Sequence, residues 1–205
     1  MSSANQYVSN QPQNSFLLQT QGYVQGIPYD DTVARLWLAT GTLDANETLP
    51  MWGGVPIEEY ITLAGSGSDG LGPDVKRASS ATTTTGWSTF AQQMHMLITP
   101  AGNVPVAGVT NGVGFFRNGT NQRLAVACDP ALITTLNGAN GSIASQALYW
   151  DVTNYRITLT TSGGNWALPT TVRLLSTNTN SKIVSYSSVT GLATWAAGSA
   201  AIILI

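Results

Sequence analysis

The chain has 205 residues, of which 43% are apolar and only 9% are charged, and its formal net charge is −2. This length makes one domain the default and is sufficient to bury an independent core. So low a net charge excludes intrinsic disorder, and the scattered basic residues exclude a nucleic-acid-binding face, which needs several cations together. Uncharged polar residues and glycine take the surface positions where Lys and Glu usually lie. Such a surface is typical of a protein that packs against copies of itself or a partner.

Residues 1–28 form a polar segment rich in Gln and Asn, bracketed by Pro12 and Pro28. Two interpretations are open: a frayed terminus, or an extended arm that orders only against a neighbouring subunit. Neither interpretation is preferred over the other, because this polar segment also contains apolar side chains that are worth burying and have no obvious local partner, namely Phe16, Leu17, Leu18, Tyr23 and Val24. We expect no secretion signal, because no basic segment precedes an apolar one.

From residue 32 onward the pattern is that of β-structure. The first expected strands are 34–40 and 59–64, and the Ser/Thr-rich run 79–85 predicts a loop or an edge strand. Residues 87–98 fit either a strand or a short helix, and a strand is slightly favoured. The longest apolar run, 200–205, is far shorter than the roughly 20 residues that span a bilayer, so we expect no membrane insertion.

The second half predicts short strands separated by Asn-Gly pairs, which supply the backbone angles of tight hairpins. The expected strands are 104–109, 113–117, 124–128, 146–150, 156–160, 171–175, 182–187 and 200–205. Between them, residues 129–136 predict one helical turn, with Asp129 as its N-cap and Pro130 at its first position. The fold class is therefore all-β: a single sandwich or barrel domain over residues 29–205, jelly-roll-like, in which 160–205 can form a β extension.

Few residues of this chain can perform catalysis. The only histidine is His95 and the only cysteine is Cys128, which lies in an apolar strand where an inert thiol is expected. The adjacent acids Asp30-Asp31 and Glu58-Glu59 point to opposite faces of a strand, so neither pair converges on a substrate. No phosphate loop, dinucleotide motif or regular calcium-ligand spacing is present. We therefore expect a protein that is not an enzyme and that has no cofactor and no metal.

Four segments together resemble a known family of proteins. They are the rigid, apolar loop within Glu47–Tyr60, then Lys76-Arg77-Ala78, then Val126–Ile133, and finally Tyr149–Asn154. In this order they resemble structural virion proteins of tailed bacteriophages, and in particular capsid decoration (cement) proteins, over about residues 15–160. The single cysteine agrees with assembly in a reducing compartment.

The resemblance implies a β-rich protein that binds the outer capsid surface and stabilises the particle by bridging major capsid protein subunits. It also implies a homotrimer or other homo-oligomer that is made in the cytoplasm of the host bacterium. The expected contact residues are Phe16, Leu17, Leu18, Tyr23, Val24, Leu49, Pro50, Met51, Trp52, Val55 and Pro56. On this hypothesis, removing residues 1–28 abolishes attachment and leaves a folded core.

The alternative is a carbohydrate-binding tail or head-fibre module that recognises the host. Its basis is the set of six Trp residues, which could stack on sugar rings if they were exposed, although core packing is their ordinary role. Binding on a glycan array, lost when one exposed Trp is changed, would favour this alternative.

Overall fold

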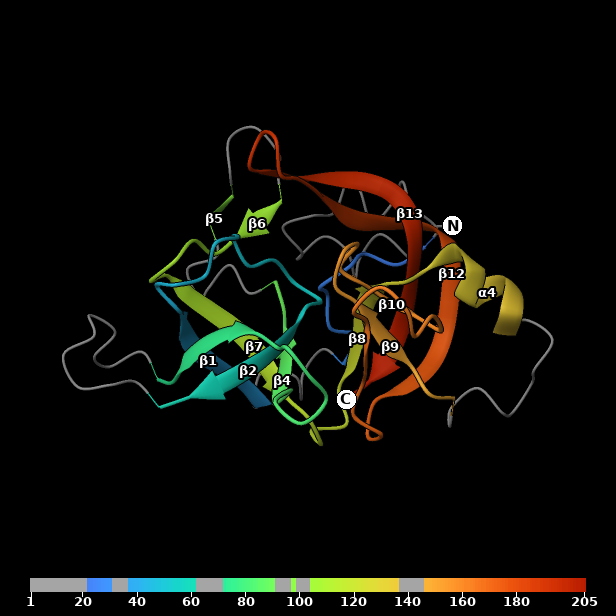
Figure 1. Ribbon diagram of the computed structural model, residues 1–205, viewed down its shortest axis with the longest axis horizontal. Coiled ribbons are helices and arrows are strands. Elements are labelled where there is room, and N and C mark those ends of the chain that lie inside the picture. The colour runs from blue at the N-terminus through green and yellow to red at the C-terminus, as the bar shows by residue number, and fades with distance from the viewer. Residues whose placement is uncertain (1–21, 31–36, 62–71, 91–96, 99–103, 137–145) are drawn as a thin grey trace, which may run out of the picture.

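The computed structural model describes residues 22–30, 37–61, 72–90, 97–98, 104–136 and 146–205. Within these ranges nearly all regular structure is β, and helix α4 (Pro130–Leu136) lies at one side of the molecule. Figure 1 shows a small barrel beside a group of sheets that is dominated by the long curved hairpin of strands β12 and β13. The predicted all-β class, a single barrel or sandwich domain, is confirmed.

Five strands close the barrel in the order β1-β3-β2-β4-β7. They are β1 (Leu38–Leu43), β2 (Pro56–Tyr60), β3 (Asp74–Arg77), β4 (Gly86–Ser88) and β7 (Gly112–Arg117). Strands β1 and β3 are parallel, and the other neighbours are antiparallel. This arrangement differs from the jelly-roll-like topology that was predicted, because a jelly roll has eight strands in two Greek keys.

Strand β7 is buried along most of its length and is packed closely against β4. Every residue from Gly112 to Phe116 is buried, as expected of a short apolar run that faces a core on both sides. Gly86 of β4 pairs with Arg117 of this strand, and a Cβ at Gly86 would lie 2.3 Å from the carbonyl oxygen of Phe116. The close approach of the two backbones therefore requires glycine at this position.

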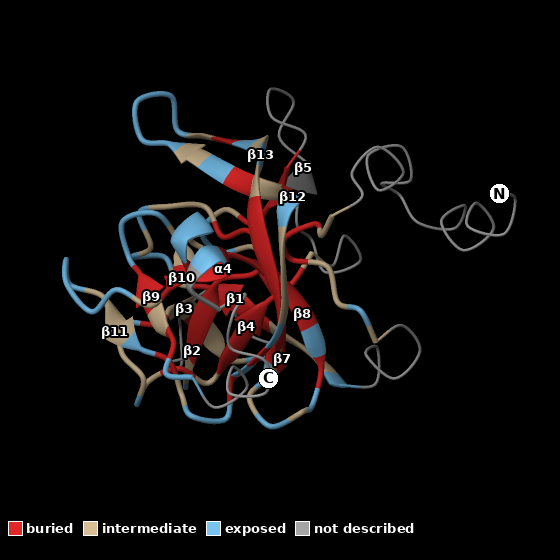
Figure 2. Cartoon of the chain, turned by 90° about the vertical axis from the view of Figure 1, so that its right-hand side faces the viewer, coloured by how far each residue is buried: buried red, intermediate tan, exposed pale blue. Residues whose placement is uncertain are grey.

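The remaining strands form three further sheets. Their order is β12-β13-β8, β10-β9-β11 and β5-β6. The elements are β5 (Leu97–Ile98), β6 (Pro105–Val106), β8 (Arg123–Ala127), β9 (Tyr149–Asp151), β10 (Arg156–Thr158), β11 (Trp166–Ala167), β12 (Arg173–Ser187) and β13 (Leu192–Leu204). The distal part of the β12–β13 hairpin projects from the body, and its tip is exposed (Figure 2).

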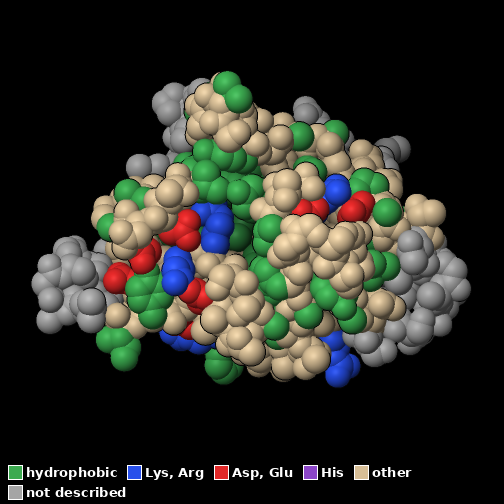
Figure 3. All heavy atoms as spheres, viewed as in Figure 1, with side chains coloured by type: hydrophobic (Ala, Val, Ile, Leu, Met, Phe, Trp, Pro, Cys, Tyr) green, Lys and Arg blue, Asp and Glu red, His purple; other side chains and the backbone are tan. Residues whose placement is uncertain are grey.

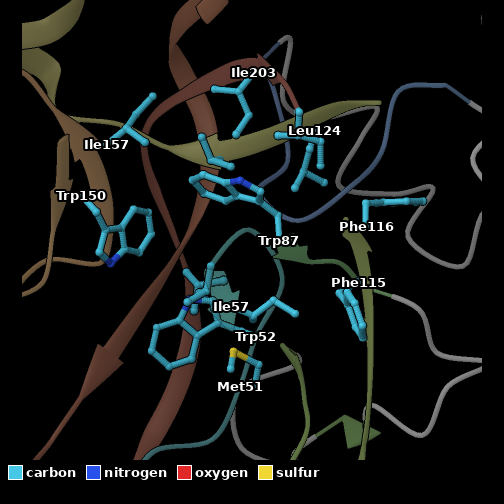
Figure 4. Close-up of a cluster of buried hydrophobic side chains, with 14 of the residues drawn as sticks. Met51, Trp52, Ile57, Trp87, Phe115, Phe116, Leu124, Trp150, Ile157 and Ile203 are labelled. Atoms are coloured by element: carbon cyan, nitrogen blue, oxygen red, sulfur yellow. The ribbon is translucent and has the colours of Figure 1, made fainter. Parts of the chain in front are cut away.

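A single cluster of buried apolar side chains joins the barrel to the other sheets. Figure 4 shows Trp52 and Met51 below Trp87, with Trp150 and Ile203 from the second group of sheets above and beside them. Trp87 and Trp150 meet edge to face with ring centroids 5.8 Å apart. The end of β13 is therefore part of the core rather than an extension, since its residues from Ser199 to Ile203 are buried.

Residues 22–30, here called the strap, hold both outer strands of the β12-β13-β8 sheet. Val24 forms a parallel bridge to Lys182 on β12, and Pro28 forms an antiparallel bridge to Leu124 on β8. Gln25 is fully buried, and its side chain accepts a hydrogen bond from the Val184 N–H and donates one to the Gly53 carbonyl. The predicted arm boundary at residue 28 is thus wrong, because residues 22–28 belong to the domain.

Several local predictions can be compared with the structure. Residues 79–85 are a loop, as one of the two expectations for them required. The strand expected over 87–98 is confirmed only for β4 and β5 at its two ends, and residues 91–96, with His95, lie outside the described ranges. Asp129 is an N-cap: its carboxylate accepts a bond from the Ala131 N–H. In the described ranges, no helix combines the length and apolarity needed to cross a membrane.

Candidate functional site

Most of the predicted contact residues that the structure describes are core residues. Met51, Trp52, Val55, Pro56 and Val24 are all buried within the chain itself. Their side chains are therefore unavailable as a contact surface, and this part of the prediction is corrected. The sequence pattern indicated a rigid apolar loop, and such a loop can equally well cover the chain's own core.

The other predicted contact residues have different positions. Tyr23, Leu49 and Pro50 are partly buried, and Tyr23 donates or accepts a hydrogen bond of 2.8 Å with the Ser176 hydroxyl on β12. Phe16, Leu17 and Leu18 lie outside the described residues. Of the predicted contact residues that the structure describes, Tyr23 is thus the one that contacts the outer edge of β12.

Arg77 closes the loop that contains Leu49 and Pro50. Its guanidinium donates to the Glu47 carboxylate at 3.0 Å and to the carbonyls of Leu49 and Pro50 at 3.1 and 2.5 Å. The guanidinium carbon also lies 4.9 Å from the centre of the Trp52 ring. Burial lowers the pKa of Arg77, and the Glu47 carboxylate partly opposes this effect. Arg77 therefore acts as a structural anchor of the loop, since these contacts surround it.

The candidate catalytic residues that the structure describes are buried or are held in ion pairs. Cys128 is a buried free thiol, and burial together with the Asp129 charge raises its pKa to about 12, so the reactive thiolate is suppressed. Glu58 and Glu59 are paired separately with Lys76 and Arg117. In the part of the chain that the structure describes, no three His, Cys, Asp or Glu residues gather as metal ligands.

Most of the described acidic and basic side chains are paired with one another. The ion pairs among the described residues are Lys76–Glu58, Arg77–Glu47, Arg117–Glu59, Arg123–Asp30, Arg156–Asp129 and Arg156–Asp151. On the face drawn in Figure 3, acidic and basic groups lie beside one another, and uncharged atoms cover most of the rest. The charges therefore stabilise local contacts and leave no large patch of one sign on this face.

A polar hollow of about 300 Å³ lies where the turn after β9, strand β10 and the start of α4 meet. Its lining residues are Asp129, Asp151, Thr153, Asn154, Arg156, Thr158, Thr160, Ser162, Gly163 and Asn165. The alternation of β10 brings Arg156 and Thr158 to one side, since side chains two apart share a face of a strand. Clefts that bind small molecules have volumes of roughly 300 Å³ and above, so this hollow is at the lower end of that range.

Arg156 is held at the centre of the hollow by two carboxylates. It donates from Nη2 to Asp129 at 3.2 Å and from Nε to Asp151 at 3.3 Å. Asp129 also accepts a bond from the Thr158 hydroxyl. Burial by itself raises the pKa of Asp151, but hydrogen bonds from Asn154, the Thr153 N–H and Arg156 outweigh it and lower that pKa. The hollow is thus a fixed polar surface with both acidic and basic groups.

The outer edge of β12 is a second candidate surface. One side of this strand pairs with β13, and the strap covers the other side near Lys182. From Leu174 to Asn180 the side chains are uncharged, and Leu175 is 46% exposed. Bulges between Leu174 and Ser176 and between Asn178 and Ser181 leave a short regular stretch, which restricts pairing to a partner of matching length.

The tryptophans do not form an exposed binding surface. Trp52, Trp87 and Trp150 are buried, Trp166 and Trp195 are partly buried, and Trp37 is 54% exposed. None of the six lines the polar hollow. The residues of the hollow were not singled out as a site by sequence reasoning, because their convergence depends on contacts between distant segments.

Comparisons of the chain with protein-family models, with curated proteins and with solved structures gave no match.

Proposed function

We propose that the chain is a structural protein of a tailed-phage virion that binds the outer capsid surface and bridges major capsid protein subunits. The observation that carries the proposal is the neutralisation of charge within the chain. Among the described residues, six carboxylates are paired with five cations, and the sequence offers few others. A surface of this kind suits dense packing on a shell, because adhesion through backbone groups and uncharged side chains needs no net charge.

The contact surface of this proposal is the outer edge of β12 together with Tyr23. Among the described residues, no strand pairs with the outer edge of β12 beyond the strap, and backbone groups on such an edge can add a strand from another chain. Leu175 supplies an exposed apolar side chain beside the uncharged residues Ser176, Thr177 and Asn178. The flanking bulges limit this addition to a short strand, so each contact is weak and the repeated shell supplies the avidity. Self-association into a trimer or other oligomer would multiply the contacts further.

The proposal is tested by sedimentation of purified protein with capsids of a phage that encodes it. Leu175→Lys places a charge on the proposed edge, and we expect it to weaken cosedimentation about tenfold or more, since a buried unpaired charge is costly. The matched control is Val189→Lys, which adds the same charge at the hairpin tip, where Val189 is 93% exposed. If wild-type protein fails to sediment with capsids, the proposed function is wrong. If both variants bind equally well, the outer edge of β12 is not the contact surface.

A test of the N-terminal arm must keep the strap. Deletion of residues 1–28 would remove Val24 and Gln25 from the core, and we expect it to unfold the domain rather than to leave it intact. Deletion of residues 1–21 leaves the strap in place and is the informative variant. Reduced capsid binding by this folded variant would support a contribution of the arm, whereas unchanged binding would exclude it.

Carbohydrate binding in a tail or head fibre is the second candidate function. Its original basis, a set of exposed tryptophans, is weakened because only Trp37 among the six is more than half exposed. The polar hollow around Arg156 now favours it, since carboxylate, amide and hydroxyl groups converge there. A glycan array tests this function: saturable binding to a defined glycan supports it, and the absence of binding across the array rejects it.

A further inference from the structure

We propose that the polar hollow around Arg156 binds a neutral sugar through its hydroxyl groups. This inference rests on the second candidate function and assigns it a site and a class of ligand. Capsid attachment involves the edge of β12 and is measured separately, so the two can fail independently.

The charge of the hollow selects against ionic ligands. Asp129 and Asp151 carry two negative charges and Arg156 carries one positive charge, which leaves a formal net charge of −1. A sugar acid or a phosphate would meet this net negative charge, and a cation would compete with Arg156, which already occupies both carboxylates. An apolar ligand would strip water from polar groups without replacing their hydrogen bonds. A neutral ligand rich in hydroxyls fits these constraints.

The hollow is organised before any ligand binds. Asp151 accepts bonds from the Thr153 and Asn154 N–H groups, from the Asn154 side chain and from Arg156. Asp129 accepts bonds from the Ala131 N–H, Arg156 and Thr158. These bonds fix the guanidinium in place, so binding does not require Arg156 to be ordered at that moment.

Enough hydrogen-bonding capacity remains for sugar hydroxyls. Of the five N–H groups of a guanidinium, the bonds to Asp129 and Asp151 use two, so three on Arg156 are not used by any other described residue. The Thr160 and Ser162 hydroxyls line the same hollow, and Asn165 contributes an amide oxygen, its Nδ2 being bonded to the Thr160 carbonyl. A sugar hydroxyl donates and accepts at once, and this mixture of donors and acceptors matches it.

The expected affinity is low. The lining contains no aromatic ring on which the apolar face of a sugar could stack. Hydrogen bonds to the ligand replace hydrogen bonds to water, so the net gain per bond is small and a dissociation constant of about 1 mM is expected.

The test is an NMR titration of the isotopically labelled full chain with methyl glycosides of glucose, galactose and mannose. We expect saturable shifts for at least one of them, concentrated in residues 151–165, with a dissociation constant of about 1 mM. The double variant Thr160→Val and Ser162→Ala removes two exposed hydroxyls that carry no described structural bond, and should weaken binding about tenfold. The control Thr170→Val makes the same type of change at an exposed residue outside the lining and should leave binding unchanged.

In the titration itself, three outcomes would overturn the inference. They are the absence of saturable shifts up to about 100 mM of every glycoside, unchanged affinity in the double variant, and tighter binding of glucuronate than of the glucose glycoside. Binding on the glycan array that survives the double variant would assign the glycan to another surface, and so would overturn this site while keeping the second candidate function.

Discussion

Two arginines on this chain hold carboxylates in different surroundings. Arg77 lies under the loop of residues 47–56, against the Trp52 and Tyr155 rings, and binds Glu47 and two backbone carbonyls. Arg156 lies in the polar hollow between Asp129 and Asp151. The Arg77 side chain is 14% exposed and that of Arg156 is 29% exposed. The first is closed in by its neighbours, whereas the second lines an open hollow.

The comparison separates an anchor from a candidate binding site. At Arg77 the aromatic rings cover the guanidinium, and even the buried Nε atom has no hydrogen-bond partner among the described residues. The missing hydrogen bond at this closed site lowers stability and cannot be supplied by a ligand, because no ligand can reach it. At Arg156 the free capacity is accessible from the hollow. Accessibility, and not the presence of an acid–base cluster, is what makes the second region a candidate for recognition.

The largest expected difference is in stability after removal of each guanidinium. We expect Arg77→Met to lower the free energy of unfolding by about 3–5 kcal/mol, because it leaves the Leu49 and Pro50 carbonyls without a donor and removes the cation that pairs with Glu47, in a mostly buried place. Glu47 then keeps the backbone N–H of residue 77 as a donor. Arg156→Met should cost less, about 1–2 kcal/mol, because Asp129 and Asp151 keep their other bonds. Urea denaturation followed by circular dichroism measures both values.

Arg117→Met is the matched control for an exposed pair. Arg117 is 55% exposed on its side chain and binds Glu59, so its loss should cost less than about 1 kcal/mol. Equal destabilisation by the Arg77 and Arg156 variants would show that the two regions are equivalent anchors, and the distinction drawn here would be lost.

Two glycines, one in each region, have the same backbone geometry. Gly54 and Gly163 both have a φ of +80°, which disfavours any residue with a Cβ. A Cβ at Gly54 would lie 2.9 Å from Cγ of Gln25, whereas at Gly163 nothing lies within 4 Å. We expect Gly54→Ala to cost about 2–4 kcal/mol and Gly163→Ala about 1–2 kcal/mol, since the first adds overpacking to the shared strain.

Thermal unfolding of both variants checks this difference. If the closed region were able to relax around the added methyl group, the two melting temperatures would fall by the same amount. That result would contradict the tight packing of the strap on the loop of residues 47–56.

The sequence predicted the β class and several turns, because these depend on local alternation and on residues with special backbone preferences. Asp129 and Pro130 predicted the start of α4 for the same reason, since capping is a local effect. The sequence alone could not show whether Met51 and Trp52 belong to a contact surface or to the core. The residues that bury this loop, such as Arg77 and Tyr186, come from distant strands that only the fold brings to it.

The strap and the hollow were missed on similar grounds. Gln25 lies in a polar segment, and its burial depends on Gly53 and Val184, which are far along the chain. The hollow needs Asp129 from the start of α4 to meet Arg156 from β10. The signal that could have indicated it is the run Asp151, Asn154 and Arg156, in which a carboxylate precedes a turn residue and a cation. That run is common in ordinary turns, so it does not predict a site by itself.

The smallest expected effect is the contribution of Asp151, in the polar hollow, to the free energy of unfolding at acid pH. The pKa of Asp151 is lowered in the folded chain, so in acid the unfolded chain binds a proton at this position more readily than the folded one. Its contribution to stability is therefore complete above the ordinary Asp pKa and is lost as the pH falls through the lowered value. Asp151→Asn removes this titration, so the variant should lose less free energy of unfolding than wild type between pH 7 and pH values below about 4.

Asp30 provides the control for this measurement, because its pKa is also lowered and neither it nor its partner Arg123 lines the hollow. Burial by itself raises the pKa of Asp30, but the hydrogen bonds from Arg123 outweigh it. Asp30→Asn should reduce the acid sensitivity of global stability in the same direction, yet leave the amide chemical shifts of residues 151–165 unchanged. The Asp151 variant should alter both, since its carboxylate holds the turn and Arg156 in place. An Asp151 variant with the full acid sensitivity of wild type would mean that this carboxylate is not held by its neighbours, and the hollow could then not be a fixed surface.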